Sequence, residues 1–209
     1  MAGALMLPGF HEGYGTILLD PPWQEHGGGK SKRGCRRHYP TLPTAEMPAV
    51  IRGSGKFLPS ERGCHLWMWV TDNFLTDGLW LIDQLGFRYV RTFQWIKLKA
   101  VTIIPCTTDD AERGYVEANA LEAARNALQY GLGQYGRGAH EMILLSVRGP
   151  TRLPGTANRQ PSVFFATRTQ HSRKPDEAFE LIHYTSPGPR IEFFARAARD
   201  GWDAWGNEV

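Results

Sequence analysis

Residues 16–23 read Thr-Ile-Leu-Leu-Asp-Pro-Pro-Trp, so that four apolar or β-branched residues run directly into a carboxylate and two prolines. The apolar run predicts a buried strand over residues 15–20, and the prolines predict its end, because proline has no N–H to donate to a sheet. Ligands of open α/β sheets bind beyond the carboxyl ends of the strands. The segment Asp20-Pro21-Pro22-Trp23 is therefore expected at a ligand-binding edge.

Apolar runs elsewhere in the chain also predict strands, at residues 65–70, 89–97, 142–147, 163–167 and 190–195. Helical spacing of apolar residues predicts two helices between them, at 72–85 and 174–183. The first is expected to bury Phe74, Leu75, Leu79, Ile82 and Leu85. The second is expected to bury Phe179 and Ile182. Alternating strands and helices predict one α/β domain over residues 1–209, with a mainly parallel sheet and helices on both faces.

Composition narrows the class of protein. Of the 209 residues 42% are hydrophobic and 22% are charged, which is typical of a globular domain. The three cysteines form no C-x-x-C pair, so we expect reduced thiols in a cytoplasmic protein and no metal site. No apolar run approaches the ~20 residues of a membrane span. The first strand is not followed by Gly-x-Gly-x-x-Gly, which argues against a dinucleotide-binding dehydrogenase.

Two long connections are candidate substrate loops, at residues 24–40 and 98–140, because long loops in compact domains are often binding loops. The first is rich in glycine and carries five basic residues, which suit contacts to nucleic-acid phosphates: Lys30, Lys32, Arg33, Arg36 and Arg37. The second contains a predicted helix at 111–130 and a tail rich in glycine, tyrosine and arginine at 131–138. The alternative for each loop is a solvated surface insertion without a role.

A carboxylate followed by two prolines suits chemistry on an aromatic amine. The lone pair of such an amine is delocalised into its ring, so an enzyme must accept hydrogen bonds from both N–H groups to direct that lone pair. Asp20 can accept one hydrogen, a carbonyl of Pro21 or Pro22 can accept the other, and Trp23 can stack on the base. The alternative is that the two prolines only terminate a strand.

The Asp-Pro-Pro-Trp motif and the segments after it resemble the MT-A70 family, relatives of the catalytic subunit of the messenger-RNA adenosine methyltransferase. The similarity continues, in the family's order, through residues 38–41, 46–47, 66–71, 93–97, 140–149, 172–177, 191–196 and 202–208. It implies a Rossmann-like class I methyltransferase domain whose motifs are permuted, with the catalytic motif early and the donor site late. It also implies S-adenosylmethionine as the methyl donor, no metal, and the 6-amino group of adenine as the acceptor.

Carried over position by position, the resemblance assigns the target adenine to Asp20, Pro21, Pro22 and Trp23. The substrate pocket would also contain Tyr39 and Glu141. The donor would be bound by Asp20, Ser172, Lys174, Glu192, Phe194, Arg196, Asn207 and Glu208. Two of these residues are unusual by themselves. Lys174 opens a predicted helix, where the helix dipole disfavours a cation, and Glu192 interrupts an apolar strand, where a carboxylate is costly unless it is paired.

The chain begins shortly before its first strand and in this resembles free-standing bacterial or phage members of the family. Those members resemble DNA-modifying enzymes, so DNA is the expected substrate and RNA the alternative. A homodimer is a further expectation, because family members often work in pairs. The remaining alternative is a catalytically silent subunit that only binds nucleic acid. It is disfavoured because Asp20, Lys174, Glu192 and Asn207 are all present.

Overall fold

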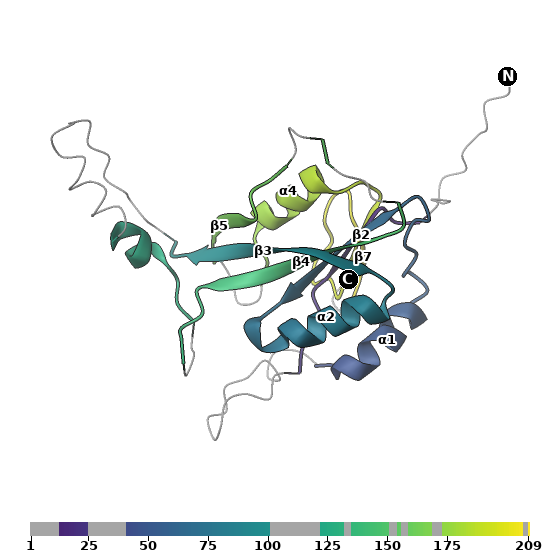
Figure 1. The fold of residues 1–209 in the computed structure, drawn as a ribbon, viewed down its shortest axis with the longest axis horizontal. Coiled ribbons are helices and arrows are strands. Elements are labelled where there is room, and N and C mark those ends of the chain that lie inside the picture. Colours follow the sequence, from purple (N-terminus) through teal and green to yellow (C-terminus); the bar gives the residue numbers. More distant parts are fainter. Residues whose placement is uncertain are drawn as a thin grey trace.

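The structure of the protein is a computed structural model, which describes residues 13–24, 41–100, 122–131, 135–150, 154–155, 159–168, 173–206 and 209. Its seven strands form one sheet, shown in Figure 1, in the order β5-β3-β4-β2-β1-β6-β7. They are β1 (Thr16–Leu19), β2 (Cys64–Val70), β3 (Arg88–Leu98), β4 (His140–Arg148), β5 (Val163–Thr167), β6 (Arg190–Phe193) and β7 (Asp203–Trp205).

The sheet is mainly parallel, as predicted. Strand β1 pairs in parallel with β2 and β6, β6 with β7, and β3 with β5. Strand β4 runs against both of its neighbours, with Met142 opposite Val70 of β2 and His140 opposite Ile96 of β3. The first residues of β4 therefore lie at the edge where β2 and β3 end. This reversal brings Glu141 to the same edge as Asp20.

Helices cover both faces of the sheet, which confirms the predicted α/β architecture (Figure 1). The helices α1 (Met47–Gly53) and α2 (Leu75–Gln84) pack on one face, preceded by the 3-10 turns η2 (Thr44–Glu46) and η3 (Asp72–Phe74). The helix α4 (Asp176–Thr185) packs on the other face. Within the part of the chain that the structure describes, no helix is long and apolar enough to cross a membrane.

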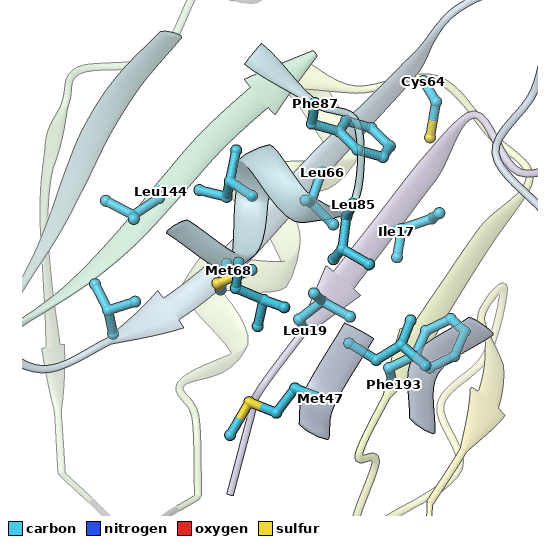
Figure 2. Close-up of a cluster of buried hydrophobic side chains, with 14 of the residues drawn as sticks. Ile17, Leu19, Met47, Cys64, Leu66, Met68, Leu85, Phe87, Leu144 and Phe193 are labelled. Atoms are coloured by element: carbon cyan, nitrogen blue, oxygen red, sulfur yellow. The ribbon is translucent and has the colours of Figure 1, made fainter. Parts of the chain in front are cut away.

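Strand alternation divides the buried side chains between two cores. Figure 2 shows the core beneath α1 and α2, where Ile17 and Leu19 of β1 meet Leu66 and Met68 of β2. The residue between them, Leu18, belongs to the second core, beneath α4. Every residue of β1 and β2 is buried, because both faces of the central strands are covered. This accounts for the uniformly apolar sequence of these strands.

The predicted helix at 72–85 is present as η3 and α2, but one of its expected core residues is wrong. The buried residues of α2 are Gly78, Leu81 and Ile82, whereas Leu79 is 36% exposed. A Cβ atom on Gly78 would lie 2.5 Å from Cγ1 of Val70, so the helix lies with Gly78 directly against β2. This close approach turns Leu79 toward solvent. The helix α4 buries Phe179 and Ile182, as expected.

The predicted helix at 111–130 extends too far. Residues 122–127 are helical, but Leu128 forms a bridge with Leu98, and the N–H of Gln129 donates to the carbonyl of Lys97 at 2.8 Å. The N–H of Gln129 therefore pairs with the end of β3 instead of continuing the helix. Residues 101–121 lie outside the described part of the chain. Neither α1 nor the three-residue strand β7 was predicted.

Candidate active site

Asp20 lies one residue beyond β1, at the predicted edge of the sheet. Its N–H donates to the carbonyl of Phe193 at 3.3 Å, which extends the pairing of β1 and β6 by one residue. This bond fixes the backbone from which the carboxylate projects. The side chain is only 12% exposed, so its charge must be met by protein groups or by a ligand.

Five charged side chains of alternating sign form a row across this edge, which we call the ion-pair row. The ammonium Nζ of Lys174 lies 3.1 Å from Oδ1 of Asp20 and 3.1 Å from Oε2 of Glu141. Lys97 forms one end of the row, with its Nζ 2.6 Å from Oε1 of Glu141. Arg196 forms the other end, with a terminal nitrogen 3.9 Å from Oδ2 of Asp20.

The order of the strands explains how the ion-pair row is assembled. Lys97 belongs to β3, Glu141 to β4, and Asp20 and Arg196 follow β1 and β6. Between β4 and β1 lies β2, and there the Nζ of Lys174 sits 4.8 Å from the centroid of the Trp69 ring. The row therefore crosses five neighbouring strands, with a cation–π contact over the middle one.

Lys174 does not lie in a helix, contrary to the prediction. It lies two residues before α4, which begins at Asp176 after the extended N-cap Pro175, with φ −72° and ψ 149°. A residue that precedes proline is disfavoured in helical conformation, so the proline fixes the start of α4. Because Lys174 is outside the helix, the argument from the helix dipole does not apply to it. A lysine at this position is explained by its place between the carboxylates of Asp20 and Glu141.

Mutual pairing sets the ionisation of the central members of the row. Burial opposes the charged form of Glu141, but the ammonium groups of Lys174 and Lys97 outweigh it and lower the pKa of Glu141 to about 2. Burial also opposes the charged form of Lys174, and the carboxylates of Asp20 and Glu141 raise the pKa of Lys174 above its usual value. These two groups therefore remain charged throughout the physiological pH range.

Glu192 lies beside the row but is not paired with it. It is opposite Leu18 of β1 and Ala204 of β7 in the sheet, and its side-chain carboxyl makes no hydrogen bond or ion pair with any described residue. Burial, followed by the nearby charge of Asp20, raises the pKa of Glu192 to about 7, against the opposing effect of Arg199, Lys174 and Arg196. A half-buried carboxyl without a partner is costly, which makes Glu192 a candidate ligand-binding group.

A strained residue directs the chain from β6 to Arg196. Phe194 has φ +60°, in the left-handed region that bulky residues rarely adopt, at a cost of about 1–3 kcal/mol. The N–H of Ala195 donates to the carbonyl of Trp205 at 3.1 Å, and the Phe194 ring packs edge-on against the Trp205 ring. These contacts hold the turn, which brings Arg196 to within ion-pair distance of Asp20.

The carbonyls of the two prolines are already hydrogen-bonded. The carbonyl of Pro21 accepts from the N–H of Trp23 at 2.8 Å, and that of Pro22 accepts from the N–H of Leu42 at 2.9 Å. Each carbonyl keeps a second lone pair, so each can still accept from a ligand. The expected role of one proline carbonyl as an acceptor for the base therefore stays a prediction.

Trp23 packs into the protein. It is 7% exposed, its ring stacks on Phe74 with centroids 5.2 Å apart, and its indole N–H donates to the carbonyl of Trp69 at 3.1 Å. These contacts leave little of the ring exposed, and the expected stacking of Trp23 on a base stays a prediction. Trp23 joins the motif to the end of β2.

Several predicted site residues lie outside the described part of the chain. They are Lys30, Lys32, Arg33, Arg36, Arg37, Tyr39, Ser172, Asn207 and Glu208. Lys97 is a site residue that sequence reasoning missed. The available signal was a lysine that directly follows Trp95 and Ile96 near the end of a predicted strand.

The fold and the comparisons agree on the class of protein. A mainly parallel seven-stranded sheet with helices on both faces is the arrangement of a Rossmann-like α/β methyltransferase. The sequence model of the MT-A70 family matches residues 119–208. The resemblance to the MT-A70 family of adenine-N6 methyltransferases is thereby confirmed.

Curated relatives are similar along nearly the whole chain. The type II methyltransferase M.MunI of Mycoplasma sp is 26% identical over 94% of this chain and 78% of its own length. The N(6)-adenosine-methyltransferase MT-A70-like protein of Arabidopsis thaliana is 24% identical over 94% of this chain and 24% of its own. The N6-methyladenosine RNA methyltransferase MTA1 of Cryphonectria parasitica is 27% identical over 94% of this chain and 52% of its own. The chain spans about a quarter of the plant relatives.

Proposed function

We propose that the protein transfers a methyl group from S-adenosylmethionine to the 6-amino group of adenine in DNA. The observation that carries the proposal is the position of Asp20. It is the carboxylate of the Asp-Pro-Pro-Trp motif, it lies at the carboxyl end of β1, and it is held there by Lys174 and Arg196. The names of the relatives, which include N(6)-adenosine and type II methyltransferases, support the same reaction.

The described residues fit a donor that carries an amino-acid group and a ribose. Glu192 supplies a half-buried carboxyl that has no partner among the described residues, which suits a pair of ribose hydroxyls. Lys174 and Arg196 supply cations for a carboxylate. S-adenosylmethionine, when bound, provides a methyl group on a positively charged sulfur. Phe194, at the strained turn between Glu192 and Arg196, would set the spacing of these groups.

Asp20 and a proline carbonyl would orient the adenine. A carboxylate has about four acceptor positions, and the described ion pairs of Asp20 engage one position on each oxygen. Asp20 can therefore accept one N–H of the 6-amino group, and the unused lone pair of the Pro21 or Pro22 carbonyl can accept the other. Two acceptors on the two hydrogens direct the nitrogen lone pair out of the base plane. Such alignment is the main requirement of a methyl transfer.

DNA is proposed over RNA because, of the three relatives described, the type II methyltransferase M.MunI is matched over the largest share of its length. The test is methylation of matched DNA and RNA of one sequence, each with unmethylated adenines, followed by nucleoside mass spectrometry. The proposal predicts N6-methyldeoxyadenosine in DNA at a rate well above N6-methyladenosine in RNA. A faster rate on RNA would assign the enzyme to the alternative substrate.

A further inference from the structure

Lys97 is enclosed in a way that a surface lysine is not. It is the second-last residue of β3, and strand alternation places its side chain on the same face as Trp95. Its Nζ lies 2.6 Å from Oε1 of Glu141 and 5.3 Å from the centroid of the Trp95 ring, and the side chain is 16% exposed. Burial of a strongly hydrated ammonium is unfavourable unless its partner compensates for the lost water. Glu141 is that partner.

The Lys97 backbone is held as firmly as its side chain. Its N–H donates to the carbonyl of Ala139 at 2.8 Å, and its carbonyl accepts from the N–H of Gln129 at 2.8 Å. Lys97 therefore projects from a fixed point. Because two strands, β4 and β2, lie between β3 and β1, Lys97 does not contact Asp20 itself. Any effect on Asp20 must pass through Glu141 and Lys174.

The two oxygens of Glu141 are divided between two cations. Oε1 accepts from Lys97 and Oε2 accepts from Lys174. Without Lys97, both oxygens would be open to Lys174, and the carboxylate could rotate about its last bond. With Lys97 bound to Oε1, the carboxylate of Glu141 cannot rotate, and Oε2 stays directed at Lys174. The ammonium of Lys174 is thereby held midway between Glu141 and Asp20, 3.1 Å from each.

We propose that Lys97 is a positioning residue, which orients Glu141 so that Glu141 holds the Lys174 ammonium against Asp20. The inference rests on the proposed function only in placing Lys174 and Asp20 at the site of methyl transfer. In this arrangement Lys97 acts through Glu141, its ion-pair partner, and not by contact with the donor or the base. It determines where the central cation of the site lies.

Substitution at Lys97 tests this arrangement. In Lys97→Met the stem remains and the charge is lost, so Lys174 becomes the single described cation beside Glu141 and is drawn away from Asp20. Lys97→Arg keeps a cation and should restore the wild-type arrangement. Lys97→Gln keeps a hydrogen-bond donor but not the charge. It takes the place of Lys97→Met if the methionine variant does not fold. Lys56→Met is the matched control, because Lys56 is exposed and lies beyond α1, away from the ion-pair row.

The first readout needs neither donor nor substrate. In protein labelled with nitrogen-15 in its lysines, the ammonium signal of Lys174 is identified by its loss in Lys174→Met. We expect this signal to move in Lys97→Met and Lys97→Gln, and to stay at the wild-type position in Lys97→Arg and Lys56→Met. A Lys174 signal that does not move in Lys97→Met or Lys97→Gln overturns the inference.

The second readout is the rate of methyl transfer. A small misplacement of a positioning group can cost about 100-fold in rate, so we expect kcat to fall about 10- to 100-fold in Lys97→Met and to recover in Lys97→Arg. Donor affinity should weaken less than in Lys174→Met, because Lys174 keeps its charge near the donor. An unchanged kcat despite a moved Lys174 signal overturns the role in catalysis. If the wild-type protein methylates no nucleic acid, the proposed function fails, and the Lys174 signal alone still decides whether Lys97 positions Lys174.

Discussion

Lys174 and Asp20 meet at 3.1 Å at the carboxyl edge of the sheet, although one precedes α4 and the other follows the first strand. Both side chains are nearly buried, so each provides most of the solvation that the other has lost. The same ammonium holds Glu141 at the same distance. The order of the candidate active site depends on this one cation between two carboxylates.

Removal of the Lys174 charge should therefore destabilise the fold as well as the site. In Lys174→Met two buried carboxylates lose their shared partner, and breaking a buried pair typically costs about 3–5 kcal/mol. We expect a loss of this order in the free energy of unfolding, measured by urea titration, and weaker donor binding by calorimetry. Lys56→Met, at an exposed lysine, should change neither. Wild-type stability in Lys174→Met would show that the buried pairs do not form in solution.

Glu192 should make stability fall as the pH rises. Its pKa is about 7 in the folded protein, whereas the unfolded chain has the ordinary value of 4.5. Between these values the folded protein keeps a proton that the unfolded chain releases, so stability is lost as the pH rises from about 4.5 to 7. Glu192→Gln cannot ionise and should not show this loss.

The measurement for Glu192 is urea unfolding of both proteins at pH 5 and pH 8. The advantage of Glu192→Gln over wild type should grow between the two pH values, by at most about 3 kcal/mol at 1.36 kcal/mol for each pKa unit. Glu180→Gln, at an exposed position of α4, is the control. If the free energy of unfolding falls equally in wild type and Glu192→Gln between pH 5 and pH 8, the pKa of Glu192 is not raised in the folded protein.

Gly206 should tolerate no side chain. A Cβ atom there would lie 2.7 Å from the backbone nitrogen of Ala195 and 3.1 Å from the carbonyl carbon of Phe194. Backbone atoms cannot move aside as a flexible side chain can, so Gly206→Ala should disturb the turn that carries Arg196. We expect a loss of about 1–3 kcal/mol in the free energy of unfolding, typical of overpacking, and reduced donor affinity.

The control for Gly206 is Gly53→Ala at the end of α1, where an added Cβ would have no neighbour within 4 Å. This substitution should leave stability within about 0.5 kcal/mol of wild type. Equal effects of the two substitutions would mean that the close contact between Gly206 and the turn at Phe194 is not present in solution.

Much of the fold could be predicted from the sequence, because several strands are apolar runs that end at prolines or other breaking residues. The run at 16–19 is buried on both faces, and the two prolines after Asp20 mark its end as expected. The direction of a strand cannot be predicted in this way, because parallel and antiparallel strands can have the same apolar sequence pattern. The reversal of β4, which carries Glu141 to the site, was therefore not visible in the sequence.

Non-local packing explains the remaining differences. The contacts of Trp23 with Phe74 and Trp69, which are distant in the sequence, bury most of its ring and were not expected. Lys97 meets Glu141 through the register of β3 and β4, and no spacing rule along the chain reveals such a register. The sequence indicated which residue types belong to the site, while tertiary pairing determined which of them share a partner.

The proposed role of Asp20, directing methyl transfer to the 6-amino group of adenine, is tested by comparing wild type with Asp20→Asn. Each protein is incubated with donor carrying a deuterated methyl group and with unmethylated DNA, and the nucleosides are analysed by mass spectrometry. We expect deuterated N6-methyldeoxyadenosine from wild type, none above background from Asp20→Asn, and normal product from the exposed control Asp83→Asn. Product from Asp20→Asn at a rate near that of wild type would show that Asp20 does not direct the transfer.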